Sequence, residues 1–328
     1  MPSKPRRSKA KPSTRKTGSL AESRALSAAI RSGQDNARNL LEIRARKRKA
    51  RSAAVRRHVQ AERTRRGAKA PIARNSTGTL VAEGDSWFDY PFYDVLKDLE
   101  DEYGYEVHSV AHRGDAVELM AYGGGQLDDL ARCVERVLRN GTPPKAILLS
   151  GGGNDVAGDA FAMLVNHRAS PNPGLNPLIL DGLLRQRIRL AYATILSAVT
   201  QLCIGYLGRP VPILVHGYAY PVPDGRGFLG GWGPLPGPWL EPGFRETGYD
   251  RLGERVAIAA RLIDAFNTMI RNVTSLPEYG HVHYIDLRPA LSNDLSNYKR
   301  SWGNELHPTE SGFKAVTARF SAVLSSLP

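Results

Sequence analysis

Four short segments of this chain hold the residue types that nucleophilic catalysis needs. They are Gly84-Asp85-Ser86, His112-Arg113-Gly114-Asp115, Gly151-Gly152-Gly153-Asn154-Asp155 and Asn304-Glu305-Leu306-His307-Pro308. The apolar run before Ser86 predicts a strand, and a residue just past the C-terminal end of a strand lies where α/β sheets bind their ligands. A serine hydroxyl needs a positioned base to take its proton as it attacks. Ser86 is therefore a candidate nucleophile, and His307 is the candidate base.

The order of the four segments matters, because each of them alone is also an ordinary turn sequence. Together they resemble the four blocks of the SGNH, or GDSL, family of serine hydrolases, and the resemblance spans residues 79–327. It implies Ser86 as nucleophile, His307 as base, and an oxyanion site made by the backbone N–H groups of Ser86 and Gly114 and the side-chain amide of Asn154. The reaction that it implies uses no cofactor.

The chain departs from the family three residues before the histidine, where the family has an aspartate and this sequence has Asn304. An amide oxygen can accept the imidazole N–H, but it brings no charge. The same exchange in a Ser-His-Asp protease lowers turnover by about 10⁴. Three interpretations remain open: Asn304 orients His307 as a neutral third member, a carboxylate of Glu305 or Asp286 replaces the missing one, or the histidine relies on a backbone carbonyl.

Two insertions follow predicted strands at the edge where a substrate should arrive, near residues 166–180 and 217–244. Loops of this length usually have a function, and the second is rich in aromatic residues. We expect it to act as a lid or binding wall. The candidate substrate contacts are His216, Tyr218, Tyr220, Trp232 and Trp239. His216 has a second interpretation, as a histidine that anchors the loop to the core.

From residue 79 onward apolar strands alternate with helices, which predicts a parallel sheet covered on both faces. The strand candidates are 80–83, 105–111, 146–150, 211–215 and 281–285, and the helix candidates are 93–103, 126–139, 183–204, 249–273 and 309–324. The predicted α/β fold is a three-layer α/β/α sandwich with five parallel strands. The family resemblance implies the flavodoxin-like strand order 2-1-3-4-5.

The N-terminal quarter differs from the rest in charge. Residues 1–74 contain 23 Lys and Arg against 4 Asp and Glu, a net charge of +19, which leaves −6 of the whole chain's +13 for the remainder. We predict a basic extension and linker over 1–75, disordered up to Gly18 and then partly helical, with a break near Gly33 and Asp35-Asn36. The hydrolase domain follows over 76–328. Residues 1–74 suit contact with an anionic membrane or nucleic acid, and a solvated tail is the alternative.

The positions of the cysteine, histidine and apolar residues argue against disulfide bonds, a metal site and a membrane span. Cys133 and Cys203 each lie in a helical pattern, so we expect two buried thiols and no disulfide framework. His281 and His283 have no acidic or Cys partner at ligand spacing, so we expect no metal site. No run of 18 apolar residues occurs, and no apolar segment follows Arg6-Arg7. We therefore expect neither a Sec signal nor a membrane span. The predicted location is the cytoplasm, and specialised export and an organellar transit peptide are the alternatives.

These observations predict a metal-independent serine esterase that hydrolyses a lipid ester or an acylated carbohydrate. The fold class does not choose among such substrates. The aromatic second insertion and the basic extension favour a lipase or phospholipase, and an acyltransferase with an acceptor other than water is a close variant. The rival hypothesis is an impaired scaffold or a secreted effector, in which Asn304 disables the site and the basic extension does the binding.

Overall fold

The computed structural model describes residues 14–63, 76–158, 160–231 and 235–328, and within the first helix the side chains of residues 20–46. Five strands form the central sheet: β1 (Thr79–Glu83), β2 (Glu106–Ser109), β3 (Ala146–Leu149), β6 (Ile213–His216) and β7 (Val282–Ile285). Their order is β2-β1-β3-β6-β7, and every pairing is parallel. The predicted flavodoxin-like order is confirmed, and each strand ends within two residues of its predicted bounds.

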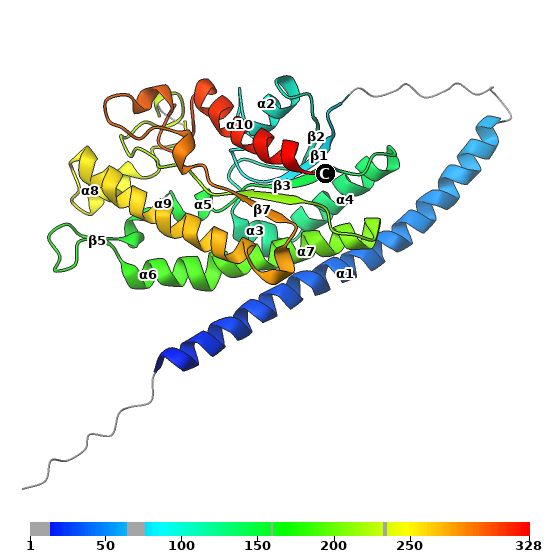
Figure 1. Ribbon diagram of the computed structural model, residues 1–328, viewed down its shortest axis with the longest axis horizontal. Helices are drawn as coiled ribbons and strands as arrows, with labels where there is room; N and C mark the ends of the chain where they lie inside the picture. The colour runs from blue at the N-terminus through cyan, green and yellow to red at the C-terminus, as the bar shows by residue number, and fades with distance from the viewer. Residues whose placement is uncertain (1–13, 64–75, 159, 232–234) are drawn as a thin grey trace, which may run out of the picture.

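Helices cover both faces of this sheet (Figure 1). One face carries α2 (Val95–Asp101) and α10 (Glu310–Ser326), and the other carries α3 (Val117–Tyr122), α4 (Gln126–Arg139), α7 (Arg189–Leu207) and α9 (Leu252–Thr274). The three-layer sandwich is therefore confirmed. The short helices α3, α5 (Gly153–Val156), α6 (Pro177–Asp181) and α8 (Glu241–Glu246) were not predicted, because segments of four to six residues are too short to show a helical period.

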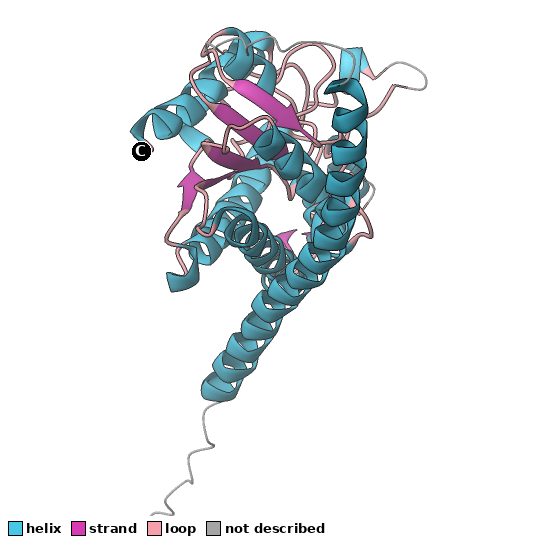
Figure 2. Ribbon diagram, turned by 90° about the vertical axis from the view of Figure 1, so that its right-hand side faces the viewer, coloured by secondary structure: helices cyan, strands magenta, loops and turns pink. Residues whose placement is uncertain are grey.

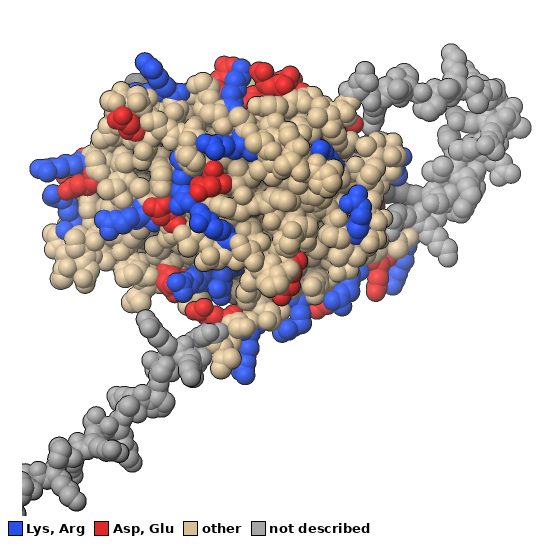
Figure 3. All heavy atoms as spheres, viewed as in Figure 1, with Lys and Arg blue, Asp and Glu red and all other residues tan. Residues whose placement is uncertain are grey.

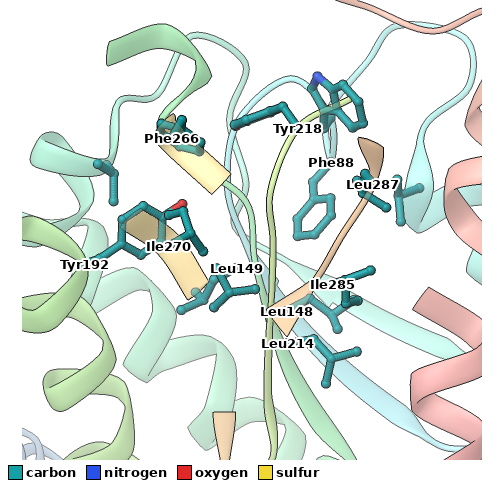
Figure 4. Close-up of a cluster of buried hydrophobic side chains, with 14 of the residues drawn as sticks. Phe88, Leu148, Leu149, Tyr192, Leu214, Tyr218, Phe266, Ile270, Ile285 and Leu287 are labelled. Carbon is teal, nitrogen blue, oxygen red and sulfur yellow. The ribbon is translucent and has the colours of Figure 1, made fainter. Parts of the chain in front are cut away.

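The hydrophobic core fills both faces of the sheet, and the part of it drawn in Figure 4 reaches the C-terminal ends of the strands. The central strands β1, β3 and β6 are buried throughout, as parallel strands between two helical layers must be. Phe266 of α9 packs beside Tyr218, which follows β6, with ring centroids 5.6 Å apart (Figure 4). Cys133 and Cys203 are buried free thiols. The core thus extends directly beneath the loops that follow β1, β3 and β6.

The first helix, α1 (Thr14–Arg63), is one continuous rod of 50 residues that runs along α7 (Figures 1 and 2). The predicted break at Gly33 is wrong, and so is the predicted disorder over residues 14–18. A Cβ atom on Gly33 would lie 2.1 Å from the Thr194 carbonyl oxygen, so the glycine permits a close helix crossing instead of ending the helix. Leu41 packs in the same way over Gly205 of α7.

An ion pair fastens the middle of α1 to α4. The guanidinium of Arg44 is 2 % exposed. It donates from Nε to Glu135 Oε1 at 2.7 Å and from Nη1 to Asp128 Oδ1 at 2.9 Å, and Nη2 also bonds Glu135. The part of α1 from Ala29 to Arg44 therefore belongs to the folded body. The rest of the predicted polyanion-binding segment, 1–74, includes residues 1–13 and 64–74, which lie outside the described residues. On the face of the body in Figure 3, acidic and basic side chains are interspersed.

The first insertion contains a small antiparallel ladder, β4 (Val165–Asn166) with β5 (Gly174–Leu175), followed by α6. The second holds a short turn, η3 (Phe228–Gly230), and ends in α8. The remaining short turns are η1 (Phe161–Leu164), η4 (Pro277–Tyr279), η5 (Arg288–Ala290) and η6 (Tyr298–Arg300). The helical run Pro177–Leu207 joins α6 to α7 through a π-helical stretch, η2 (Gly182–Ile188), and is by length and composition apolar enough to cross a membrane. Of its most apolar window 61 % is buried inside the structure, as in a core helix.

Candidate active site

The loop after β1 presents Ser86, and the buried carboxylate of Asp85 shapes it. Asp85 Oδ1 accepts hydrogen bonds from the Trp87 N–H at 3.0 Å and from Ser150 Oγ at 2.7 Å, and Oδ2 accepts one from the Tyr218 hydroxyl. Gly84 leaves room for this loop to approach β3, because a Cβ atom there would lie 2.7 Å from Ser150 Cβ. Asp85 therefore acts as an orienting residue, as predicted.

His307 meets Ser86 across 221 positions of the sequence. Its Nε2 lies 2.7 Å from Ser86 Oγ, and its side chain is buried, at 7 % exposure. The histidine precedes α10, where Thr309 is the N-cap and its side chain accepts from the Gly312 N–H at 3.1 Å. Trp87 Nε1 also donates to the Leu306 carbonyl at 3.2 Å, so the nucleophile loop and the histidine loop are tied together directly.

Asn304 is the partner of His307 on the other side of the ring. Its Oδ1 lies 3.1 Å from His307 Nδ1 and also accepts from the backbone N–H groups of Leu306, at 3.0 Å, and His307, at 2.8 Å. Backbone N–H groups can only donate, so the amide cannot flip without opposing donor to donor. Hydrogen bonding thus assigns the proton to Nδ1 and leaves Nε2 free to face the Ser86 hydroxyl.

Tyr90 completes this arrangement and was not foreseen. Its hydroxyl accepts from Asn304 Nδ2 at 3.1 Å, and its ring stacks on the imidazole of His307 with centroids 4.4 Å apart. Asn304 is 2 % exposed, so its Nδ2 needs such an acceptor. Tyr90 lies only four residues after the serine, but nothing in the local sequence points from a loop tyrosine to a residue more than 200 positions away.

The two carboxylates considered as substitutes for the missing aspartate point elsewhere. Glu305 accepts four backbone N–H groups of the second insertion. Asp286 bonds Arg288, at 2.9 Å to Nε, and lies 3.5 Å from Arg271 Nη2. Neither contacts His307, so the carboxylate interpretation is wrong, and among the described residues Asn304, and no backbone carbonyl, is the partner of His307 Nδ1.

Burial lowers the pKa of His307 to about 3. The charged imidazolium loses its hydration in this apolar setting, and no carboxylate compensates for the loss. The ring is therefore neutral at ordinary pH, which is the form that can accept a proton from Ser86.

Gly114 and Asn154 lie beside the Ser86–His307 pair. Gly114 has φ of +91°, a conformation that favours glycine, and Asn154 Nδ2 donates to the Asp115 carbonyl at 2.9 Å, which leaves its second N–H available. Within the described residues no acceptor takes the N–H of Ser86 or of Gly114. All three residues line one cavity. Asp155, next to Asn154, accepts from the Val117 N–H at 2.9 Å, and burial raises its pKa to about 6.

Two cavities in the described part of the chain meet at Ser86 and His307. The first measures about 50 Å³ and has apolar walls that include Val156, Leu240 and Ile263. The second measures about 310 Å³. Its walls are mostly aromatic rings and prolines with one charged pair: Tyr90, Phe228, Trp239, Pro91, Pro236, Asp89 and Arg113. A small apolar recess and a larger aromatic one therefore flank the same hydroxyl group.

The predicted substrate contacts fall into different places. Tyr218 lines the first cavity and Trp239 the second. Tyr220 donates to Asp264 Oδ1 at 2.8 Å and lines neither. Trp232 lies outside the described residues.

His216 belongs to the core and lines neither cavity. It is fully buried, its Nε2 lies 2.8 Å from Ser150 Oγ and its Nδ1 lies 3.0 Å from the Gly217 carbonyl. This is the anchoring role, and the pocket-lining one is wrong. His216, Ser150 and Asp85 form a buried hydrogen-bonded chain that supports the Ser86 loop. In the described part of the chain, no three His, Cys, Asp or Glu side chains gather as metal ligands would.

Comparison with known proteins finds similarity in structure but not in sequence. The sequence matches no protein-family model, and no curated protein is similar to it in sequence. Three similar solved structures are a lipase from a goat rumen metagenome, a catalytic mutant of an acetylxylan esterase from Geobacillus stearothermophilus and a member of the lipolytic G-D-S-L family from Veillonella parvula. Their identities to this chain are 12 %, 14 % and 10 %, with TM-scores of 0.45, 0.40 and 0.39. They cover 75 %, 77 % and 76 % of it, and 97 %, 96 % and 99 % of their own chains are matched.

Proposed function

We propose that this protein is a serine ester hydrolase that works without a metal. The observation that carries the proposal is the 2.7 Å contact between Ser86 Oγ and the unprotonated Nε2 of His307, with Asn304 on the opposite ring nitrogen. A hydroxyl, a base and a group that orients the base are the minimal parts of nucleophilic acyl transfer. The rival hypothesis of an impaired scaffold attributes a loss of function to Asn304, and the 3.1 Å contact of Asn304 Oδ1 with His307 Nδ1 argues against it, because the base keeps a group that orients it.

The proposed reaction has two halves. Ser86 Oγ bonds to the ester carbonyl carbon while its proton passes to His307 Nε2, and the carbonyl electron pair moves to the oxygen. That oxyanion accepts hydrogen bonds from the N–H groups of Ser86 and Gly114 and from the amide of Asn154. When the tetrahedral intermediate collapses, the C–O bond to the alcohol breaks and the alcohol takes the proton from His307. Water then attacks the acyl-enzyme in the same way, and Ser86 is restored.

The two cavities favour a short acyl group and a larger alcohol. One water-sized volume takes about 10–15 Å³ on the scale used for cavities, so the first cavity, at about 50 Å³, holds roughly three to five non-hydrogen atoms. We assign it to an acyl group of acetyl to butyryl size. The aromatic second cavity then receives the alcohol part, and flat or sugar-like rings would stack on its walls.

The test is hydrolysis of 4-nitrophenyl esters from acetate to palmitate, with Ser86→Ala as the control. We expect kcat/KM to be greatest between acetate and butyrate and to fall by more than about tenfold for octanoate, because the longer chain exceeds the first cavity. Activity that rises toward palmitate would contradict the assignment of the acyl site. Hydrolysis that survives in Ser86→Ala would contradict the proposed nucleophile.

A further inference from the structure

Glu305 is a buried carboxylate that neutral groups alone hold in place. Its side chain is fully buried. Oε1 accepts from the N–H groups of Gly225, at 3.0 Å, and Glu241, at 3.1 Å, and Oε2 accepts from those of Trp239, at 2.7 Å, and Leu240, at 2.8 Å. Within the described residues no Lys, Arg or His forms an ion pair with it. A buried charge is expensive unless hydrogen bonds compensate it, so four donors converging on one carboxylate mark a built feature.

These four donors come from the two ends of the second insertion. Gly225 lies near its start, and residues 239–241 form its return to α8. The Glu305 N–H also donates to the Arg226 carbonyl at 3.2 Å, and Arg226 Nη1 donates to the Gly303 carbonyl at 2.9 Å. The insertion is thus closed on itself and fastened to the segment that carries the histidine.

The fastened residues are those that shape the two cavities. Trp239 lines the larger cavity and meets the imidazole of His307 edge to face, with ring centroids 5.5 Å apart at 73°. Leu240, the next residue, lines the small apolar cavity. One carboxylate therefore fixes the backbone of the wall that separates the two recesses.

We propose that Glu305 is a positioning residue that determines substrate specificity by holding residues 225–231 and 235–241 as a fixed wall of the alcohol site. The proposal rests on the proposed function, since it concerns the same site. The neighbouring residues Asn304 and Glu305 then have different roles. Asn304 orients the base, whereas Glu305 points the other way and holds the backbone of the surface against which the leaving group lies. The second insertion is then a wall and not a lid.

A glutamine at this position would have nearly the same shape but only one accepting oxygen. Whichever way its amide turned, the NH₂ group would face two of the four backbone N–H donors. Glu305→Gln is therefore the informative change, and Glu246→Gln is its control, because it removes the same charge from an exposed position on α8.

The activity test compares two acetates that differ only in the alcohol, methyl acetate and 2-naphthyl acetate, followed by titration of the acid released. We expect the wild type to prefer the naphthyl ester. Glu305→Gln should lower the ratio of kcat/KM for naphthyl to methyl ester by at least about tenfold, mainly through KM, whereas Glu246→Gln should leave it unchanged. Trp239→Ala should lower the ratio as well, and Glu305→Gln should lower it little further in that background, because both act on one wall.

An unchanged ratio in folded Glu305→Gln would overturn the proposal. So would an equal loss of kcat for both esters, because that would show an effect on His307 instead of on the wall.

Hydrogen exchange supplies a second readout that needs no activity. The amides of Gly225, Trp239, Leu240 and Glu241 should be protected in the wild type, and these four amides should exchange at least about tenfold faster in Glu305→Gln. If the wild type hydrolyses no ester but Glu305→Gln still accelerates amide exchange, the proposed function is wrong, and the proposal that Glu305 holds the second insertion in place is supported. If the four amides are unprotected in the wild type, Glu305 does not hold the second insertion in place. This comparison needs only the wild type, so it decides the question even where Glu305→Gln does not fold.

Discussion

Replacing Asn304 by aspartate should restore a charge that the site lacks and move its pH profile. The new carboxylate would lie at the position of Oδ1, 3.1 Å from His307 Nδ1. At an effective dielectric constant of about 20, opposite charges about 4 Å apart attract by about 4 kcal/mol, which is about three pKa units. The pKa of His307, now about 3, would rise to about 6.

The same attraction stabilises the imidazolium that forms as Ser86 attacks. Part of this attraction offsets the cost of desolvating the buried carboxylate. We therefore expect kcat to rise by about 10- to 100-fold at pH 8, which is less than the full attraction of about 4 kcal/mol would give. The assay is kcat/KM for 4-nitrophenyl acetate between about pH 4 and 9. The acid limb of the wild type should lie below about pH 5, and that of Asn304→Asp near about 6.

Asn272→Asp adds the same charge at an exposed position on α9 and should change neither kcat nor the limb. If folded Asn304→Asp shows the wild-type limb and the wild-type kcat, Asn304 is not the group that faces the catalytic imidazole, and the account of the base is wrong.

Three further predictions concern other parts of the structure. Tyr90→Phe keeps the ring on the imidazole but leaves the Asn304 amide without an acceptor, so kcat should fall about tenfold with KM nearly unchanged, and an unaltered kcat would show that the bond is unimportant. Burial raises the pKa of Glu83 from 4.5 to about 8, so the folded protein keeps a proton that the unfolded chain releases. The free energy of unfolding should fall by about 1.4 kcal/mol per pH unit across that interval, and urea titrations of Glu83→Gln should lack this slope if the argument holds. Arg44→Ala breaks a buried ion pair with Glu135 on α4 and should lower the free energy of unfolding by about 3–5 kcal/mol, against less than about 0.5 for exposed Arg46→Ala, whereas equal losses would mean that α1 is not fastened there.

The sheet and the meeting of Ser86 with His307 could be predicted because both leave local signals. Buried parallel strands are short apolar runs between turn residues, and three of the four candidate segments stand at the ends of such runs, whereas the fourth precedes the last helix. The N-terminal helix could not be predicted so well. Gly33 has the same sequence signal as a helix break, and only the position of the Thr194 carbonyl shows that it serves a close crossing.

The hydrogen-bond partners of individual polar side chains could not be predicted from the sequence, for a related reason. Asn304, Glu305 and Asp286 all remained open as the third member, because each is a short distance from His307 in sequence or in the expected fold. Their roles depend on side-chain direction, which follows from contacts with Tyr90 and with the second insertion, more than 60 positions away. Asn304 turned out to face the imidazole, and Glu305 the opposite way.

The most direct test of the central claim is covalent labelling of the nucleophile by a fluorophosphonate, followed by intact mass and peptide mapping. Such a probe reacts with a serine only where a base activates it. The account predicts one adduct per chain, on Ser86, with no adduct in Ser86→Ala and much slower labelling in His307→Ala. An adduct on another serine, or a folded wild-type protein that is not labelled, would contradict it.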